Sequence, residues 1–75
     1  MVDNGFVRVE IGLDGGQILS ILVTPPSADA LEASLSAGAL GALDLEAQDG
    51  HILLVLSRVL YAKRFARETR VGFEA

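Results

Sequence analysis

Residues able to carry out chemistry gather near the C-terminal end of the printed sequence, where five of the six basic side chains lie within thirteen positions. These bases are Arg58, Lys63, Arg64, Arg67 and Arg70, and the aromatic residues Tyr61 and Phe65 lie among them. Bases that contact phosphates beside aromatic rings that stack on nucleotides are typical of proteins that bind single-stranded RNA or DNA. The segment is therefore a candidate contact for nucleic acid or for a protein partner.

Charge is distributed unevenly along the chain. Residues 1–50 carry a net charge of −7 and residues 51–75 a net charge of +3, which gives −4 overall. An acidic protein attracts a polyanion poorly over long distances, which argues against the nucleic-acid interpretation. The alternative is that the bases pair with carboxylates, either across the sheet with Asp44 and Glu46 or across a subunit boundary with the acidic half of another copy. We favour this second interpretation.

The expected strand geometry supports the same preference. If residues 59–65 form a strand, successive side chains point to opposite faces of the sheet. Tyr61, Lys63 and Phe65 then share one face, and Arg64 lies on the other. The bases therefore do not line one continuous basic face.

Other polar residues are weaker candidates for chemistry. His51 as a general base needs an orienting partner and a nearby nucleophile; Asp49 is close in sequence, but no serine or threonine is suitably placed. We interpret His51 as a solvated turn residue. Asp44 and Glu46 alternate along one strand face, where a carboxylate pair or a loose cation site is conceivable, but no third ligand is visible. We predict no catalytic residue, no metal site and no cofactor.

Three glycines resemble a phosphate-binding loop in composition only. Gly12, Gly15 and Gly16 join two predicted strands rather than a strand and the N-terminus of a helix. The helix dipole and the cradle of amide groups that hold a phosphate are therefore missing. A turn is the better interpretation, and we do not expect this chain to be an enzyme.

Hydrophobic periodicity predicts the elements that position these residues. Residues 6–13 alternate between apolar and polar side chains, which is typical of a half-buried strand, and Asp14-Gly15-Gly16 predicts a tight hairpin turn. Residues 17–24 return as a second strand that is apolar on both faces. Two prolines end this strand, because neither can donate a hydrogen bond to a neighbouring strand. Ser27 is then predicted as the N-cap of a helix of about three turns that stops at Gly38.

The second half of the chain predicts further strands. Residues 42–47 alternate again, and after a turn residues 51–56 are apolar on both faces. Residues 59–65 predict another strand, and residues 70–73 a short closing strand. The chain, residues 1–75, is thus predicted as a single small α+β domain. Its expected architecture is a single antiparallel sheet in the order β-β-α-β-β-β, followed by the short last strand, with one short helix packed on one face.

The two strands with apolar side chains on both faces create a packing problem. One amphipathic helix covers one face of a sheet and leaves the other face open. Burial of roughly four to six surplus side chains, at about 1.5–3 kcal/mol each, favours a homo-oligomer, either a dimer or a ring. Two alternatives remain open: the sheet curls into a small barrel, or the chain termini fold over the spare face.

Composition limits the other classes of protein. The chain has no cysteine, so disulfides and thiolate metal sites are excluded. The longest apolar run, residues 52–56, is far shorter than the ~20 residues of a membrane span. No basic region followed by an apolar run opens the sequence, so no signal peptide is predicted. We expect a cytoplasmic protein without a membrane partner.

Five short motifs follow one another along the chain: VEIGL (9–13), SADALEASL (27–35), a leucine-to-glycine turn (45–50), SRVLY (57–61) and RVGF (70–73). Together they resemble a family of very short actinobacterial proteins of unknown function. Its members have V-x-I-G in the first strand, one helix, a turn near L-T-D-x-x-G, then A-R-I-A-Y and a terminal R-V-G-F. The resemblance spans nearly the whole chain. It implies the same fold and a bacterial cytosolic setting, and it implies no activity, cofactor or catalytic residue.

These features predict a non-enzymatic, self-associating interaction or adaptor protein, with other proteins as further partners. The alternative is a single-stranded nucleic-acid-binding protein that uses the basic C-terminal strands. The two hypotheses differ in what the apolar surplus and the basic cluster are for.

Overall fold

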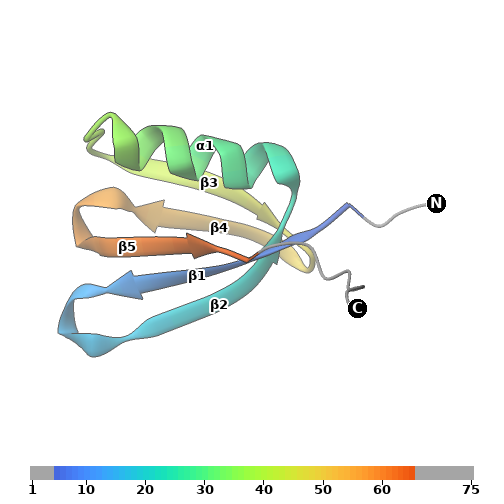
Figure 1. Ribbon diagram of the computed structural model, residues 1–75, viewed down its shortest axis with the longest axis horizontal. Coiled ribbons are helices and arrows are strands. Elements are labelled where there is room, and N and C mark those ends of the chain that lie inside the picture. Colours follow the sequence, from blue (N-terminus) through green and yellow to red (C-terminus); the bar gives the residue numbers. More distant parts are fainter. Residues whose placement is uncertain (1–4, 66–75) are drawn as a thin grey trace, which may run out of the picture.

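Five strands and one helix make up the part of the chain that the computed structural model describes, residues 5–65. The elements are β1 (Val7–Leu13), β2 (Ile18–Val23), α1 (Pro25–Ser36), β3 (Ala42–Ala47), β4 (Gly50–Val55) and β5 (Val59–Arg64) (Figure 1). The strands form one antiparallel sheet in the order β4-β3-β2-β1-β5. The predicted α+β class and element order are confirmed. The closing strand predicted at residues 70–73 lies outside the described residues.

The β1–β2 hairpin closes through a short 3₁₀ turn at Asp14–Gly16. Gly15 and Gly16 have φ angles of 87° and 86°, a left-handed conformation that residues with a Cβ atom rarely adopt. The Leu13 N–H donates a 2.8 Å hydrogen bond to the Gln17 carbonyl and closes the turn. The predicted hairpin is therefore confirmed.

The start of α1 differs from the prediction, which placed the N-cap at Ser27. The helix begins at Pro25, and Thr24 is the N-cap, because its Oγ1 accepts a 3.3 Å hydrogen bond from the Ser27 N–H. Proline suits the first helical turn, where its fixed φ is already helical and its missing N–H would have no partner. Ser27 is instead buried, and its Oγ accepts a 2.9 Å hydrogen bond from the Glu46 N–H, which ties α1 to β3.

The end of α1 is fixed at Gly38, as predicted. Gly38 has a φ of 68°. Its N–H donates to the Leu35 carbonyl at 3.1 Å, and the next N–H, of Ala39, donates to the Ser34 carbonyl at 2.9 Å. These two hydrogen bonds satisfy carbonyls that the last helical turn leaves without partners.

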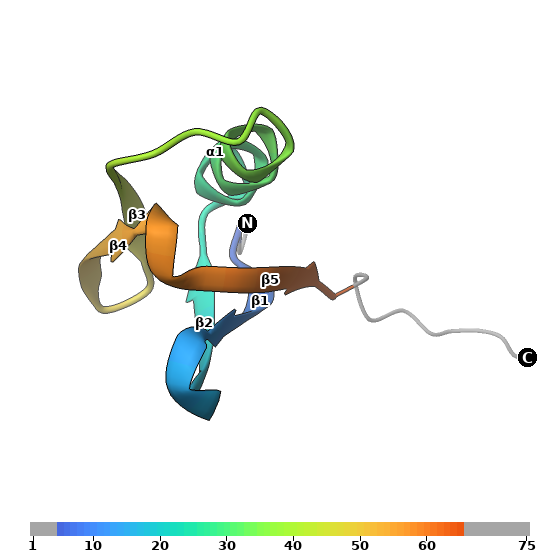
Figure 2. The same cartoon turned by 90° about the vertical axis from the view of Figure 1, so that its left-hand side faces the viewer.

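The sheet consists of two parts that meet along a short seam. β1 pairs with β2 and β5, and β3 pairs with β4, whereas β2 and β3 share one registered pair, Val23 with Ala47. The Thr24 N–H adds a 3.0 Å hydrogen bond to the Glu46 carbonyl at the seam. Figure 2 shows that the β3–β4 hairpin turns away from the other strands, so the sheet is strongly bent. It does not close into a barrel among the described residues: β4 and β5 are its two edge strands.

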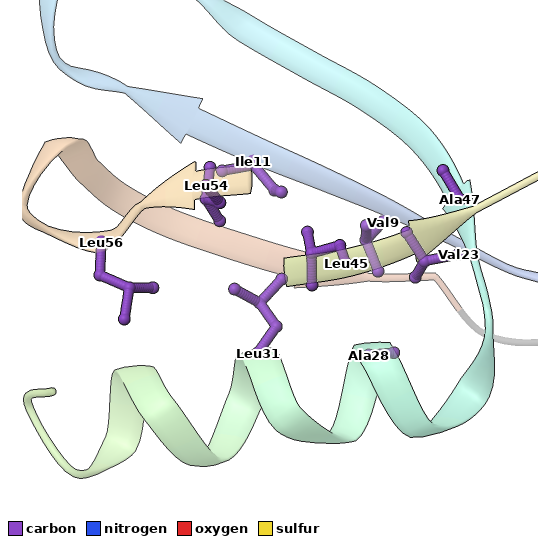
Figure 3. Close-up of a cluster of buried hydrophobic side chains, with 9 residues drawn as sticks. All are labelled: Val9, Ile11, Val23, Ala28, Leu31, Leu45, Ala47, Leu54 and Leu56. Atoms are coloured by element: carbon purple, nitrogen blue, oxygen red, sulfur yellow. The ribbon is translucent and has the colours of Figure 1, made fainter. Parts of the chain in front are cut away.

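The hydrophobic core lies between α1 and the concave side of the sheet (Figure 3). Ile11 and Leu45 are fully buried, and Leu31 of α1 packs against them. The complete buried cluster is Val9, Ile11, Val23, Ala28, Leu31, Leu45, Ala47, Leu54 and Leu56. The prediction of one helix packed on one face is confirmed. We call the opposite side of the sheet the outer face.

Candidate functional site

The basic and aromatic residues of β5 lie beside β1 at one edge of the sheet. Glu10 opposes Lys63 in the antiparallel register. Because side chains alternate along a strand, this register places Tyr61, Lys63 and Phe65 on the outer face and Arg64 on the face that packs against α1. The sequence-predicted division of these residues between two faces matches this arrangement.

Tyr61 connects β5 to β1 on the outer face. Its hydroxyl donates a 2.8 Å hydrogen bond to Oε2 of Glu10, and its ring lies over Gly12, where an added Cβ atom would overlap the ring atoms. The hydrogen bond to the Glu10 carboxylate raises the pKa of Tyr61, and desolvation and the negative charge of Glu10 act in the same direction. Tyr61 is thus held by partners within the chain.

Phe65 is flanked by two cations. Cζ of Arg8 lies 5.2 Å and Nζ of Lys63 lies 4.7 Å from the centroid of the Phe65 ring, and both distances are within cation–π range. The Phe65 N–H also donates a 3.0 Å hydrogen bond to the Arg8 carbonyl. Arg8 therefore belongs to this site, although the sequence analysis did not select it. Only the pairing of β1 with β5, which no local pattern reveals, brings Arg8 there.

Arg64 points toward α1 and is neutralised there. Its Nη1 lies 2.7 Å from Oδ1 of Asp29 and 3.1 Å from Oε1 of Glu32. The two acids are three residues apart on α1 and so lie on the same side of the helix. The hydrogen bond to Asp29 raises the pKa of Arg64 further above its ordinary value, although burial opposes the shift.

Arg58 forms an exposed ion pair at the other end of β5. Its Nη1 lies 3.1 Å from Oδ2 of Asp14, in the β1–β2 turn. Arg58 and Arg64 thus pair with acids of the first half of the chain, but not with Asp44 and Glu46, because β5 lies beside β1 and not beside β3. Two further predicted bases, Arg67 and Arg70, lie outside the described residues.

His51 forms a pair that the sequence analysis did not predict. Its Nδ1 lies 3.0 Å from Oδ1 of Asp44, on the exposed outer face of the β3–β4 hairpin, and Glu46 opposes His51 in the register. The two-residue turn between β3 and β4 was the available signal, because it sets the register that makes Asp44 a diagonal neighbour. Within residues 5–65, no three histidine, cysteine or acidic side chains gather closely enough to hold a metal ion.

A surface depression of about 430 Å³ lies beside this region, where β2 diverges from β3. Its lining residues are Arg8, Ser20, Ile21, Leu22, Ala47, Gln48 and Asp49. Arg8 and Asp49 are the charged residues of this set, and they give it one cation and one carboxylate. The other lining residues are uncharged.

The outer face also carries large apolar side chains. Ile18 of β2 is 63% exposed, and Leu53 and Val55 of β4 are 70% and 50% exposed. These residues belong to the two strands predicted to be apolar on both faces, and the neighbouring Leu54 points inward and is buried. Among the described residues, the further exposed large hydrophobic ones are Phe6, Leu22, Leu40, Leu60 and Tyr61. Surplus apolar surface is therefore present.

Compared with known proteins, the chain matches no family model, no curated protein and no solved structure. The resemblance to the short actinobacterial family therefore stays a prediction from the sequence motifs. The 12-residue α1 is too short to cross a bilayer, and no helix among residues 5–65 qualifies as a membrane span.

Proposed function

We propose that the chain is a non-enzymatic interaction module that works by self-association. The observation that carries this proposal is the exposed apolar part of the outer face, where Leu53, Val55 and Ile18 project from the side of the sheet that α1 does not cover. Full burial of a leucine, isoleucine or valine side chain contributes about 1.5–3 kcal/mol. A second copy that covers part of this surface would recover free energy that the single chain leaves unused.

The size of the chain strengthens this argument. A fold as small as the described residues 5–65 buries only about 60% of the surface that its unfolded chain exposes. Domains of this size commonly gain stability from disulfides, a metal or oligomerisation, and the absence of cysteine removes the first of these. Self-association is then the route that the exposed side chains favour.

The polar groups of the outer face also fit a contact surface better than a reaction site. Tyr61 is hydrogen-bonded to Glu10, and His51 is hydrogen-bonded to Asp44, and all four side chains lie at the solvent-exposed surface. Neither pair faces an enclosed space that would exclude water from a reaction. We therefore assign these pairs to the surface that meets a partner.

Size-exclusion chromatography with light scattering tests self-association directly. We expect a mass of at least twice the 7.9 kDa of one chain at micromolar concentration, with dissociation on dilution. A single 7.9 kDa species at all concentrations up to about 1 mM would rule out the proposal, because a Kd of about 1 mM corresponds to only about 4 kcal/mol of association free energy.

One observation favours nucleic-acid binding as a second candidate function. Tyr61, Lys63 and Phe65 share the outer face with Arg8, so that two aromatic rings and two cations lie on one exposed surface. A single-stranded oligonucleotide would then bind with strong salt dependence. Lys63→Glu should abolish a low-salt gel shift, whereas Arg58→Glu should leave it largely unchanged, because Arg58 pairs with Asp14 away from this surface. The absence of any shift of the native chain discards this candidate.

A further inference from the structure

Among residues 5–65, β4 is an edge strand that lacks the usual protection against pairing with another strand. It is the last strand of the sheet on its side, and Figure 2 places it at the margin of the fold. Natural edge strands are commonly protected by charged side chains. The other edge strand, β5, contains Lys63 and Arg64, whereas residues 50–55 include no aspartate, glutamate, lysine or arginine.

The free backbone groups of β4 can be assigned from its pairing with β3. The Leu56 N–H donates to the Gly41 carbonyl at 2.9 Å, which marks this pair as hydrogen-bonded. In an antiparallel ladder, hydrogen-bonded and non-hydrogen-bonded pairs alternate. The backbone groups of His51, Leu53 and Val55 therefore point away from β3, toward the open side of the sheet. The side chains of the same three residues lie on the outer face and are exposed.

We propose that β4 pairs antiparallel with β4 of a second copy of this chain, about a two-fold axis at Leu53. This inference rests on the proposed self-association and names its surface. A register in which Leu53 opposes Leu53 of the second copy also sets His51 opposite Val55 of that copy, and Val55 opposite its His51. In this register, the outward N–H and C=O groups of all three residues form hydrogen bonds with the same groups of the second copy. One β4 edge is therefore complementary to another β4 edge.

The side chains fit the same arrangement. The two Leu53 side chains, each 70% exposed in the single chain, meet at the axis and cover one another. Val55 of each copy packs beside the His51 ring of the other. The paired strands thus bury apolar surface on the outer face while they extend the sheet across both copies.

Charge is compatible with a second β4 strand as the occupant. No ionised carboxylate or ammonium group lies on either paired strand, so no like charges oppose each other across the new ladder. The nearest acid, Asp44, opposes Leu53 on β3. The two Asp44 side chains are therefore separated by three strand spacings, about 14 Å, which exceeds the Debye length of about 8 Å at physiological salt. A β5 strand, by contrast, would bring Lys63 and Arg64 to the contact.

Single cysteines test the register, because the native chain has none. Opposed residues of a hydrogen-bonded antiparallel pair have Cα atoms about 5.5 Å apart, which a disulfide spans. Under mild oxidation, Leu53→Cys should therefore give a disulfide-linked dimer as its main product. Ile18→Cys is the matched control, since Ile18 is also exposed on the outer face, at 63%, but lies on an internal strand. It should remain monomeric on a non-reducing gel.

The outcomes separate this inference from the proposed function. If the native chain is dimeric by light scattering and Leu53→Cys cross-links no faster than Ile18→Cys, self-association stands and the β4 pairing is wrong. If Leu53→Cys cross-links only when mixed with Lys63→Cys, β4 pairs with β5 instead and the inference is likewise overturned. If the native chain is monomeric, both fail. As an independent variant, Leu53→Lys should reduce the native mass to that of one chain while its circular dichroism spectrum stays native.

Discussion

The ring of Tyr61 lies so close over Gly12 that a Cβ atom at position 12 would overlap it. Gly12 opposes Tyr61 in the β1–β5 register, and the tyrosine hydroxyl continues across β1 to the carboxylate of Glu10. The glycine thus provides the space in which the ring crosses from one strand to the other. This contact fixes the one tyrosine of the chain between the two strands.

We predict that Gly12→Ala destabilises the protein by about 1–3 kcal/mol, because the added methyl group displaces the Tyr61 ring and breaks its contact with Glu10. Urea denaturation followed by circular dichroism measures the free energy of unfolding. In a Tyr61→Ala background, Gly12→Ala should instead increase the free energy of unfolding. Alanine is favoured over glycine in a strand by about 0.5–1 kcal/mol once the ring is gone. An equal loss in both backgrounds would show that the ring is not the cause.

We predict that Glu10→Gln lowers the pKa of Tyr61 toward its ordinary value, because the carboxylate that accepts its hydrogen bond is lost. The chain has one tyrosine and no tryptophan, so the ultraviolet absorbance of tyrosinate reports this residue alone. The raised pKa means that the folded state favours the neutral form of Tyr61. The hydrogen bond of neutral Tyr61 therefore stabilises the fold fully below the unfolded-state pKa of about 10. This stabilisation is lost as the pH rises through the folded-state pKa. The Glu10→Gln variant should lose this part of the alkaline dependence, and an unchanged titration curve would contradict the assignment.

We predict that Ser27→Ala lowers the free energy of unfolding by about 1–3 kcal/mol, because the Glu46 N–H loses its partner at the junction of α1 and β3. The same oxygen also accepts a 3.0 Å hydrogen bond from Oγ1 of Thr24. Ser36→Ala is the matched control, because Ser36 is exposed at the end of the same helix. That variant should be neutral or slightly stabilising, since alanine is the better helix former. Thermal melts of both variants give the comparison.

We predict that Arg64→Gln lowers the melting temperature at low salt, because Asp29 and Glu32 then repel each other without their shared cation. The difference in melting temperature between Arg64→Gln and the native chain should become smaller in about 1 M salt, because the Debye length is then only about 3 Å. Lys63→Gln removes a base from the adjacent position of the same strand and provides the control. It should show a smaller salt-dependent difference, because its described contact is with the Phe65 ring.

Local patterns in the sequence predicted most elements of the fold. The alternation around Val9 and Ile11, the glycine pair at the first hairpin and Gly38 at the helix end each carry their own conformational signal, and each is confirmed. The N-cap was wrongly placed at Ser27 because the two prolines were interpreted only as a strand end. Proline is also common in the first turn of a helix, and α1 begins at Pro25 with Thr24 as its N-cap.

The candidate site was harder to predict because strand order decides it. Alternation alone predicted that Tyr61 and Lys63 share one face of the sheet, but it did not predict that this is the outer face. Their neighbours Glu10 and Arg8 could not be named, because nothing local specifies that β5 returns to β1. The contact of Arg64 with Asp29 and Glu32 of α1 could not be predicted for the same reason. Contacts between distant segments depend on the whole packing arrangement, which a single sequence does not display.

The return of β5 to β1 has a consequence for how the chain acquires its structure. Val9 and Arg64 are paired, so this contact encloses nearly the whole described chain in one loop. Closing such a loop costs entropy before any contact compensates it, and pairing of this kind slows folding. During synthesis, the edge of β1 that pairs with β5 therefore stays unpaired until residues 59–64 have left the ribosome, and an unpaired strand edge is a template for pairing with other chains.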